Sequence, residues 1–122
     1  RIFLYKNVFF TPISIYNLIK VLSKLIRLNT KGIYNVCGNE RISKYQFGLK
    51  MAKIFNFDKN LIIESELMQK KIIRPLDMSL SNKKIKNIFG NNIILNLDGQ
   101  LKNLQKMYTK NIYYKIKNSL KI

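Results

Sequence analysis

The chain has 122 residues, enough for one domain, and 47% of them are hydrophobic, which argues against wholesale disorder. Its formal net charge of +17 comes from 23 basic and 6 acidic residues and would attract any anionic ligand. The absence of His excludes His-dependent triads and His metal ligands, and the single cysteine, Cys37, excludes an intrachain disulfide.

The first predicted elements are a strand and a helix. The run from Val8 to Ile13 is β-branched and aromatic, as strands are, and Pro12 limits ladder pairing near its end. Ser14 is the expected N-cap of a helix that extends to Leu28 and buries Leu18, Leu22 and Leu25. The apolar residues that support this helix follow at helical spacing: Ile15, Leu18, Ile19, Leu22, Leu25 and Ile26.

A second strand and helix follow. The apolar run from Ile33 to Cys37, bounded by Gly32 and Gly38, predicts a short strand in which Cys37 is a small buried residue. Ser43 begins the next helix, because Gln46 lies at the spacing of a capping box. The apolar surface of this helix is expected to comprise Tyr45, Phe47, Leu49, Met51, Ile54 and Phe55.

The second half of the chain continues the alternation. Asp58 to Ile63 predicts a turn and a short strand, and 64–80 a loop in which Ser65 to Met68 can form a helical turn. Ser81 is the expected cap of a helix closed by Gly90, and Asp98 opens a final helix. Residues 110–122 form a basic, Tyr-rich tail. Strands alternating with helices favour an α/β fold.

Three sequence motifs follow one another in a characteristic order: FTPISIYNLIKVL (Phe10 to Leu22), GIYNVCGNERISKYQFGLKMAKIF (Gly32 to Phe55) and RPLDMSLSNKKIKNIFG (Arg74 to Gly90). Together they resemble the C-terminal part of an extended short-chain dehydrogenase/reductase, in the branch of the dTDP-4-dehydrorhamnose reductases. The resemblance covers about residues 7–107. It implies a C-terminal fragment of a Rossmann-type α/β enzyme, with 1–109 as its substrate-binding portion and 110–122 as the tail.

The chain lacks two of that family's features: a glycine-rich dinucleotide loop, and a catalytic Tyr-x-x-x-Lys with its partner Ser or Thr. Tyr113-x-x-x-Lys117 has the spacing but lies in the tail, at the wrong end of the chain. The resemblance therefore implies that a missing N-terminal Rossmann domain binds most of the NAD(P) and supplies catalysis. Asn35, where relatives often have His, and Asn17, in place of an acidic residue, leave the substrate's identity open.

By the same resemblance, the sugar-nucleotide site includes Arg74, Pro75, Ser79 and Thr11. A guanidinium can bind two phosphate oxygens as a fork, which Lys cannot do with the same geometry. The structural alternative is that Arg74 pairs with Glu64, Glu66 or Asp77 and only shapes its loop. Thr11 is equally able to serve a helix start instead of a ligand.

The implied function is substrate binding in an NAD(P)-dependent oxidoreductase that acts on a nucleotide-linked deoxysugar for surface polysaccharide synthesis, with this fragment alone not catalytic. The alternative is a basic nucleic-acid-binding or regulatory module. Against specific nucleic-acid binding, the 23 basic residues are 19 Lys and only 4 Arg, and the abundant Lys, Ile and Asn share AT-rich codons. No apolar run approaches the roughly 18 residues of a membrane span. We therefore expect no transmembrane segment and a cytoplasmic location.

Overall fold

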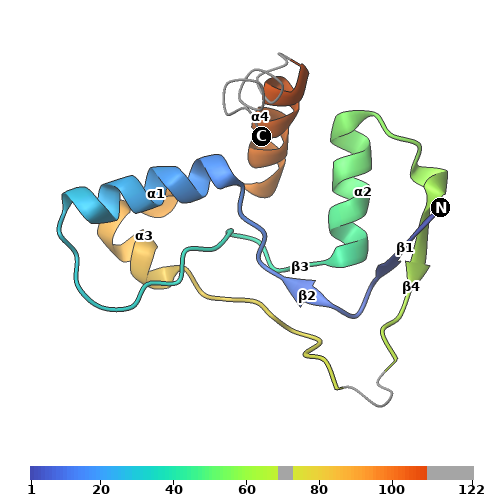
Figure 1. The fold of residues 1–122 in the computed structure, drawn as a ribbon, viewed down its shortest axis with the longest axis horizontal. Coiled ribbons are helices and arrows are strands. Elements are labelled where there is room, and N and C mark those ends of the chain that lie inside the picture. Colours follow the sequence, from blue (N-terminus) through green and yellow to red (C-terminus); the bar gives the residue numbers. More distant parts are fainter. Residues whose placement is uncertain (69–72, 110–122) are drawn as a thin grey trace, which may run out of the picture.

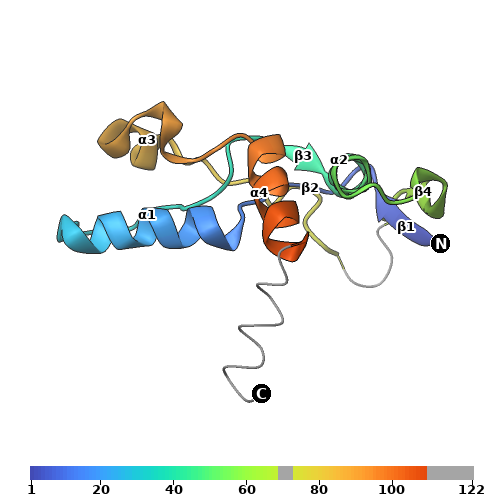
Figure 2. The ribbon, with the colours of Figure 1, turned by 90° about the horizontal axis from the view of Figure 1, so that it is seen from above.

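The computed structural model describes residues 1–68 and 73–109, whose elements lie along one long axis (Figures 1 and 2). At one end, β1 (Ile2–Tyr5) pairs in parallel with β4 (Ile62–Ser65). Nearer the middle, β2 (Phe9–Phe10) pairs antiparallel with β3 (Ile42–Ser43). The predicted tail, with its Tyr113 and Lys117, lies outside the described residues.

Helices accompany these short strands, which confirms the predicted α/β class. In this part of the chain they are α1 (Ile15–Arg27), α2 (Lys44–Phe55), α3 (Lys83–Phe89) and α4 (Leu97–Thr109), with 3₁₀ turns η1 (Lys59–Leu61) and η2 (Asn91–Ile93). Figures 1 and 2 both show α1 and α3 at one end, α2 beside β1 and β4 at the other, and α4 between them.

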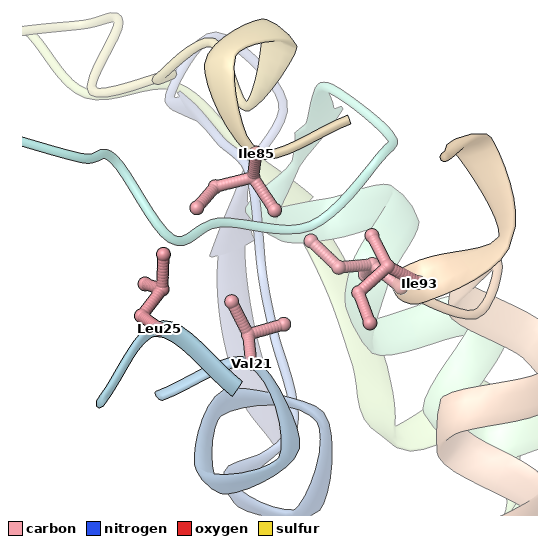
Figure 3. Close-up of a cluster of buried hydrophobic side chains, with 5 residues drawn as sticks. Val21, Leu25, Ile85 and Ile93 are labelled. Carbon is pink, nitrogen blue, oxygen red and sulfur yellow. The ribbon is translucent and has the colours of Figure 1, made fainter. Parts of the chain in front are cut away.

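Two small hydrophobic clusters hold the helices and strands together. The first joins α1, α3 and η2, and Figure 3 shows its side chains converging: Val21, Leu25, Ile85, Ile93 and Ile94. The second lies between β3, α2 and α4, and its buried members are Ile42, Leu97 and Leu101. Phe10 from β2 and Phe47 from α2 pack on the second cluster, with their rings edge to face and 5.4 Å between centroids. Phe47 is therefore a packing residue.

Helix α1 begins as predicted but buries a different face. The Oγ of Ser14 accepts hydrogen bonds from the backbone N and the Nδ2 of Asn17, which confirms Ser14 as the N-cap. The buried residues are Asn17, Val21 and Leu25, whereas Leu22 is 41% exposed. The predicted burial of Leu22 is therefore wrong, and that of Leu25 is confirmed.

The polar residue Asn17 explains why α1 buries a different face from the predicted one. Its Oδ1 accepts a hydrogen bond from the backbone N of Leu95 at 3.2 Å, and its Nδ2 is satisfied by Ser14. With both ends of its amide bonded, Asn17 is tolerated in the interior, at 1% exposure. A pattern of apolar residues alone ranks such a position as surface.

The predicted strand from Ile33 to Cys37 is also wrong, since the structure assigns no strand there. Instead the segment passes between α1 and α3, where Tyr34 and Val36 pack on the first cluster. Cys37 is buried as expected, and its thiol donates to the carbonyl of Leu80 at 3.2 Å. Lacking a neighbouring strand among the described residues, the segment has no ladder to join.

Close backbone contact fixes the chain where this segment ends. A Cβ on Gly38 would lie 1.9 Å from the carbonyl oxygen of Pro12, so only glycine fits. The backbone N of Gly38 donates to the carbonyl of Thr11 at 3.2 Å. Phe10, Thr11 and Pro12 are thereby held against the turn that leads to β3.

The start of α3 differs from the prediction by one residue. The N-cap is Asn82, not Ser81, and its side chain makes no capping hydrogen bond. Its Nδ2 instead donates to the carbonyls of Cys37 and Gly38 and to the Oδ1 of Asn39. Asn82 thus ties α3 to a distant turn, and α3 ends before Gly90 as expected.

Three further predictions agree with the structure, and one does not. Ser43 and Gln46 form the reciprocal bonds of a capping box, which confirms the start of α2. The expected turn and strand near Asp58 appear as η1 and β4. The possible helical turn from Ser65 to Met68 does not form, because Ser65 belongs to β4 and residues 66–68 are irregular. Asp98 lies in the first turn of α4.

Candidate functional site

The loop that contains the Arg-Pro pair runs beside β2. The backbone N of Phe9 donates to the carbonyl of Leu76 at 2.7 Å, and the N of Met78 donates to the carbonyl of Phe9 at 2.9 Å. Further along, the N of Leu80 donates to the Oγ1 of Thr11 at 3.1 Å. The structure therefore brings together Thr11 and the Ser79–Leu80 phrase, which are almost seventy residues apart in the sequence.

Asp77 organises the centre of this loop. Its Oδ1 accepts from the backbone N of Ser79 at 2.9 Å and from the Ser79 hydroxyl at 2.5 Å. Its Oδ2 accepts from the Nε of Arg41 at 2.9 Å and from the Nη2 at 2.8 Å. The Arg41 guanidinium also lies 3.8 Å from the centre of the Phe9 ring. Arg41 thus fastens the loop to β2.

Arg41 is the residue that sequence reasoning missed. Like Arg74, it is one of only 4 Arg among 23 basic residues, and its guanidinium offers the same fork of donors. Its position just before β3 turns it toward Phe9 of the paired strand β2. Such a cross-strand pairing is set by strand register and is not visible in a local motif.

The four donors around Asp77 lower the pKa of its carboxyl to about 2, chiefly through the hydrogen bonds from Ser79 and then through Arg41. A lowered pKa means that Asp77 stabilises the fold fully above its usual pKa near 4, and that this stabilisation is lost as the pH falls toward 2.

We predict that Ser79→Ala raises the pKa of Asp77 toward its usual value, because the variant loses the hydroxyl donor. NMR titration of the Asp77 carboxyl in the intact protein measures this shift. Ser81→Ala is the matched control, since no bond joins Ser81 to Asp77, and it should leave the titration unchanged. A wild-type Asp77 that titrates near pH 4 would contradict the arrangement described here.

Arg74 and Pro75 lie at the exposed start of the same loop, and Asp77 follows two residues after Pro75. The three acids that might have paired with Arg74 all bind other cations. Glu64 and Glu66 bind the Nζ of Lys6 at 2.8 and 3.1 Å, and their hydrogen bonds raise the pKa of Lys6. Asp77 binds Arg41.

A second polar cluster is structural in character. The Nζ of Lys50 on α2 lies 2.5 Å from the Oδ1 of Asp98 on α4 and 3.6 Å from Glu40, and Glu40 also accepts from the backbone N of Leu97. The bond to Asp98 raises the pKa of Lys50, and Lys50 lowers the pKa of Asp98. These contacts join α2 to the start of α4.

Two hollows lie elsewhere on the described part of the molecule. An apolar groove of about 830 Å³ lies between α2 and the β1–β4 pair and is lined by residues such as Leu4, Phe47 and Met51. A polar hollow of about 340 Å³ is lined by asparagines that include Asn39 and Asn91. Neither is lined by Arg74, Pro75, Ser79 or Thr11.

Residues 1–68 and 73–109 contain neither a candidate metal site nor a candidate membrane span. No group of three or more His, Cys, Asp or Glu side chains is placed to hold a metal ion. Within the same ranges, no helix is both long and apolar enough to cross a membrane.

No protein-family model matches the sequence, and no curated protein matches it. Among solved structures, a dTDP-4-dehydrorhamnose reductase from Clostridium acetobutylicum is similar, with a TM-score of 0.76 and 17% identity over 88% of this chain and 39% of that chain. A hypothetical dTDP-4-dehydrorhamnose reductase from Sulfolobus tokodaii has a TM-score of 0.64 and 32% identity over 80% of this chain and 36% of that chain.

A dTDP-glucose 4,6-dehydratase from Bacillus anthracis, solved in complex with NAD, is similar over 91% of this chain and 35% of that chain, with a TM-score of 0.66 and 15% identity. The present chain thus spans well under half the length of each of these proteins. Two of the likenesses have low identity and show the fold alone, whereas the Sulfolobus protein shares 32% of aligned residues. The chain therefore has the fold of one part of a Rossmann-type short-chain dehydrogenase/reductase, and it resembles the dTDP-4-dehydrorhamnose reductases.

Proposed function

We propose that the chain is the substrate-binding portion of an NAD(P)-dependent oxidoreductase that acts on a nucleotide-linked deoxysugar. The longer protein to which it belongs, called the parent protein below, reduces or epimerises that sugar for surface polysaccharide synthesis. Support comes from the similar structures, which are named as sugar-nucleotide reductases and a dehydratase, one of them in complex with NAD.

The observation that carries the proposal is the hydrogen bond from the N of Leu80 to the Oγ1 of Thr11. It places two elements of the proposed ligand site side by side. A diphosphate needs donors, and the hydroxyl hydrogen of Thr11 has no acceptor among the described residues. The guanidinium of Arg74, at the start of the loop, adds a fork of donors suited to phosphate oxygens.

Ser79 and Pro75 have different tasks in this site. The Ser79 hydroxyl already donates to Asp77, so it has no second hydrogen for a phosphate. Ser79 therefore shapes the loop through Asp77. Pro75 has no backbone donor and restricts the residue before it, Arg74, to an extended conformation. Binding is thereby assigned to Arg74 and Thr11, and positioning to Pro75 and Ser79.

Catalysis is assigned to residues outside this chain. When bound, the nicotinamide supplies the hydride, and a Tyr acid with its Lys neighbour would come from the Rossmann domain. The side chains of the present chain hold the substrate's diphosphate and orient the sugar toward that centre. No described group of this chain is required to exchange a proton with the sugar.

The parent protein is mixed with NADH or NADPH and dTDP-4-dehydrorhamnose. If it is a reductase, it should oxidise the nicotinamide, which absorbance measures directly; if it is an epimerase, it should invert a centre of the sugar with no net loss of nicotinamide, which NMR of the sugar nucleotide measures. The 122-residue chain alone should do neither, because it lacks the dinucleotide loop and the catalytic residues. Turnover by the chain alone, or none by the parent protein with any nucleotide-linked keto sugar, would contradict the proposal.

The alternative function, a basic nucleic-acid-binding module, is favoured by the net charge of +17. A binding titration of RNA and DNA into the parent protein tests this alternative. Lys-dominated charge predicts weak binding that falls with salt and shows no sequence preference. Strong preference for one sequence at physiological salt would favour the alternative instead.

A further inference from the structure

The loop that contains the Arg-Pro pair, residues 74–80, lies beside β2 like an added strand. Asp77 of this Arg-Pro loop forms an isolated parallel bridge with Phe9 of β2. The backbone of Phe9 binds the residues on both sides of Asp77, because its N donates to the carbonyl of Leu76 and its carbonyl accepts from the N of Met78. The other edge of β2 pairs with β3. These bonds fix the register of the Arg-Pro loop at Asp77.

Arg41 reaches from the start of β3 to the same residue of the Arg-Pro loop. Its guanidinium lies over Phe9, 3.8 Å from the ring centre, and it binds the Oδ2 of Asp77 through Nε at 2.9 Å and Nη2 at 2.8 Å. One side chain therefore contacts both β2 and the Arg-Pro loop. A Lys could not make this arrangement, because its ammonium lacks both the planar face and the second donor nitrogen.

The second oxygen of Asp77 is also bound. Its Oδ1 accepts from the backbone N of Ser79 at 2.9 Å and from the Ser79 hydroxyl at 2.5 Å. The carboxylate is therefore held on both sides, by its own loop through Oδ1 and by Arg41 through Oδ2. Of these contacts, the one with Arg41 joins the Arg-Pro loop to the start of β3.

The ion pair between Arg41 and Asp77 lies at the surface, where the two side chains are 51% and 49% exposed. Ion pairs at such exposure add little to the free energy of unfolding, because water screens the charges. We therefore expect this contact to affect where the Arg-Pro loop lies more than whether the protein folds.

The proposed ligand residues lie close to Asp77 on both sides. Arg74 precedes it by three residues, and Leu80, which donates to the Oγ1 of Thr11 at 3.1 Å, follows it by three. In an extended chain, a slip of one residue moves a side chain by roughly 3.3 Å and turns it to the opposite face. The register at Asp77 therefore decides whether Arg74 and Thr11 can reach the same diphosphate.

We propose that Arg41 is a positioning residue for the nucleotide-linked sugar. It holds the Arg-Pro loop in the register that places Arg74 and Thr11 at one diphosphate, and it does so through Asp77 without touching the ligand. This inference rests on the proposed function. It extends that function, because it makes the affinity for the substrate depend on a residue at the start of β3, outside the proposed ligand site.

Steady-state kinetics of the parent protein test this role. Arg41→Gln should raise the KM for the nucleotide-linked sugar by roughly ten- to a hundredfold, a loss that a small misplacement of binding groups can cause. The kcat and the affinity for the nicotinamide cofactor should change little, because both are assigned to the Rossmann domain. Arg41→Lys should recover only part of the loss, since the charge remains and the second donor nitrogen is absent.

A second variant, Asp77→Asn, breaks the contact with Arg41 alone. The Oδ1 of the new amide can still accept both hydrogen bonds from Ser79, but its amino group turns donors toward the guanidinium. This variant should raise the KM for the sugar as Arg41→Gln does. The double variant should be no worse than either single one, because all three lose one interaction. Additive losses would show that Arg41 acts on the ligand apart from Asp77 and would overturn the proposal.

Lys50→Gln is a control, since it also removes one cation from a partly exposed ion pair, here with Asp98. It should leave the KM for the sugar unchanged. An equal rise in Lys50→Gln and Arg41→Gln would trace the effect to net charge and overturn the proposal. An unchanged KM in Arg41→Gln would do the same, as would equal losses in kcat and nicotinamide affinity, which indicate general damage to the fold.

Failure of this inference differs from failure of the proposed function. If the wild-type parent protein neither binds nor converts a nucleotide-linked sugar, the proposed function fails, and the role of Arg41 fails with it. If the wild-type protein is active and Arg41→Gln leaves the KM for the sugar unchanged, the function stands and only the role of Arg41 fails.

Discussion

Ile85→Ala is expected to destabilise the protein by about 2–5 kcal/mol, the range for removing a large aliphatic side chain from a packed core. Ile85 is 0% exposed and is the member of the first cluster contributed by α3, where it meets α1 and η2. Its removal leaves a cavity between these three elements. Denaturant titration of the parent protein, followed by hydrogen exchange at α3, measures the loss.

Ile88 offers a matched control on the same helix. It has the same side chain but is 40% exposed, so Ile88→Ala should cost less than about 1 kcal/mol. Equal losses for the two variants would show that burial of Ile85 between α1 and η2 does not hold in solution. The comparison also removes the effect of helix propensity, because both variants place Ala in α3.

Arg74→Ala should weaken nucleotide-sugar binding to the parent protein by roughly ten- to a hundredfold. Losing a charge-assisted hydrogen bond typically costs about 1.5–3 kcal/mol, which corresponds to that range of affinity. Binding of the nicotinamide cofactor should change little, because the proposed site holds the substrate's diphosphate. Arg74→Lys should recover only part of the loss, since the charge remains and the fork is absent. Calorimetric titration of both ligands measures the effects separately.

The matched control for Arg74 is Arg27, another exposed arginine, in the last turn of α1. Arg27→Ala removes the same charge from a chain of net charge +17 and should leave sugar-nucleotide affinity unchanged. If Arg74→Ala also leaves that affinity unchanged, Arg74 only shapes its loop. If both variants weaken binding equally, the loss of affinity comes from the lower net charge of the protein and not from the loss of a guanidinium that binds two phosphate oxygens.

Several features of the fold could be predicted from sequence because they depend on residues close together in the chain. The capping box at the start of α2 joins Ser43 to Gln46, three residues on, and the N-cap of α1 joins Ser14 to Asn17. The end of α3 at Gly90 is equally local. Such hydrogen bonds form within one helical turn, so a short stretch of sequence contains all the participants.

The candidate site could be predicted only in part. Its sequence motifs could be recognised. Two of its contacts could not, because they join segments that are distant in the chain: the hydrogen bond between Leu80 and Thr11, and the ion pair between Arg41 and Asp77. Arg41 acts through strand pairing between β2 and β3, which a single motif does not encode. The bond from the Ser79 hydroxyl to Asp77 was likewise not part of the sequence prediction.

The sequence by itself determined the starts of α1 and α2, the end of α3 and which segments are apolar. The tertiary structure decided which face of α1 is inside, because Asn17 is buried only when the backbone of Leu95 and the hydroxyl of Ser14 satisfy its amide. It also decided that Ile33–Cys37 is not a strand here. A strand requires hydrogen bonds to a neighbour, and no described segment supplies one, whereas a helix satisfies its backbone from its own residues.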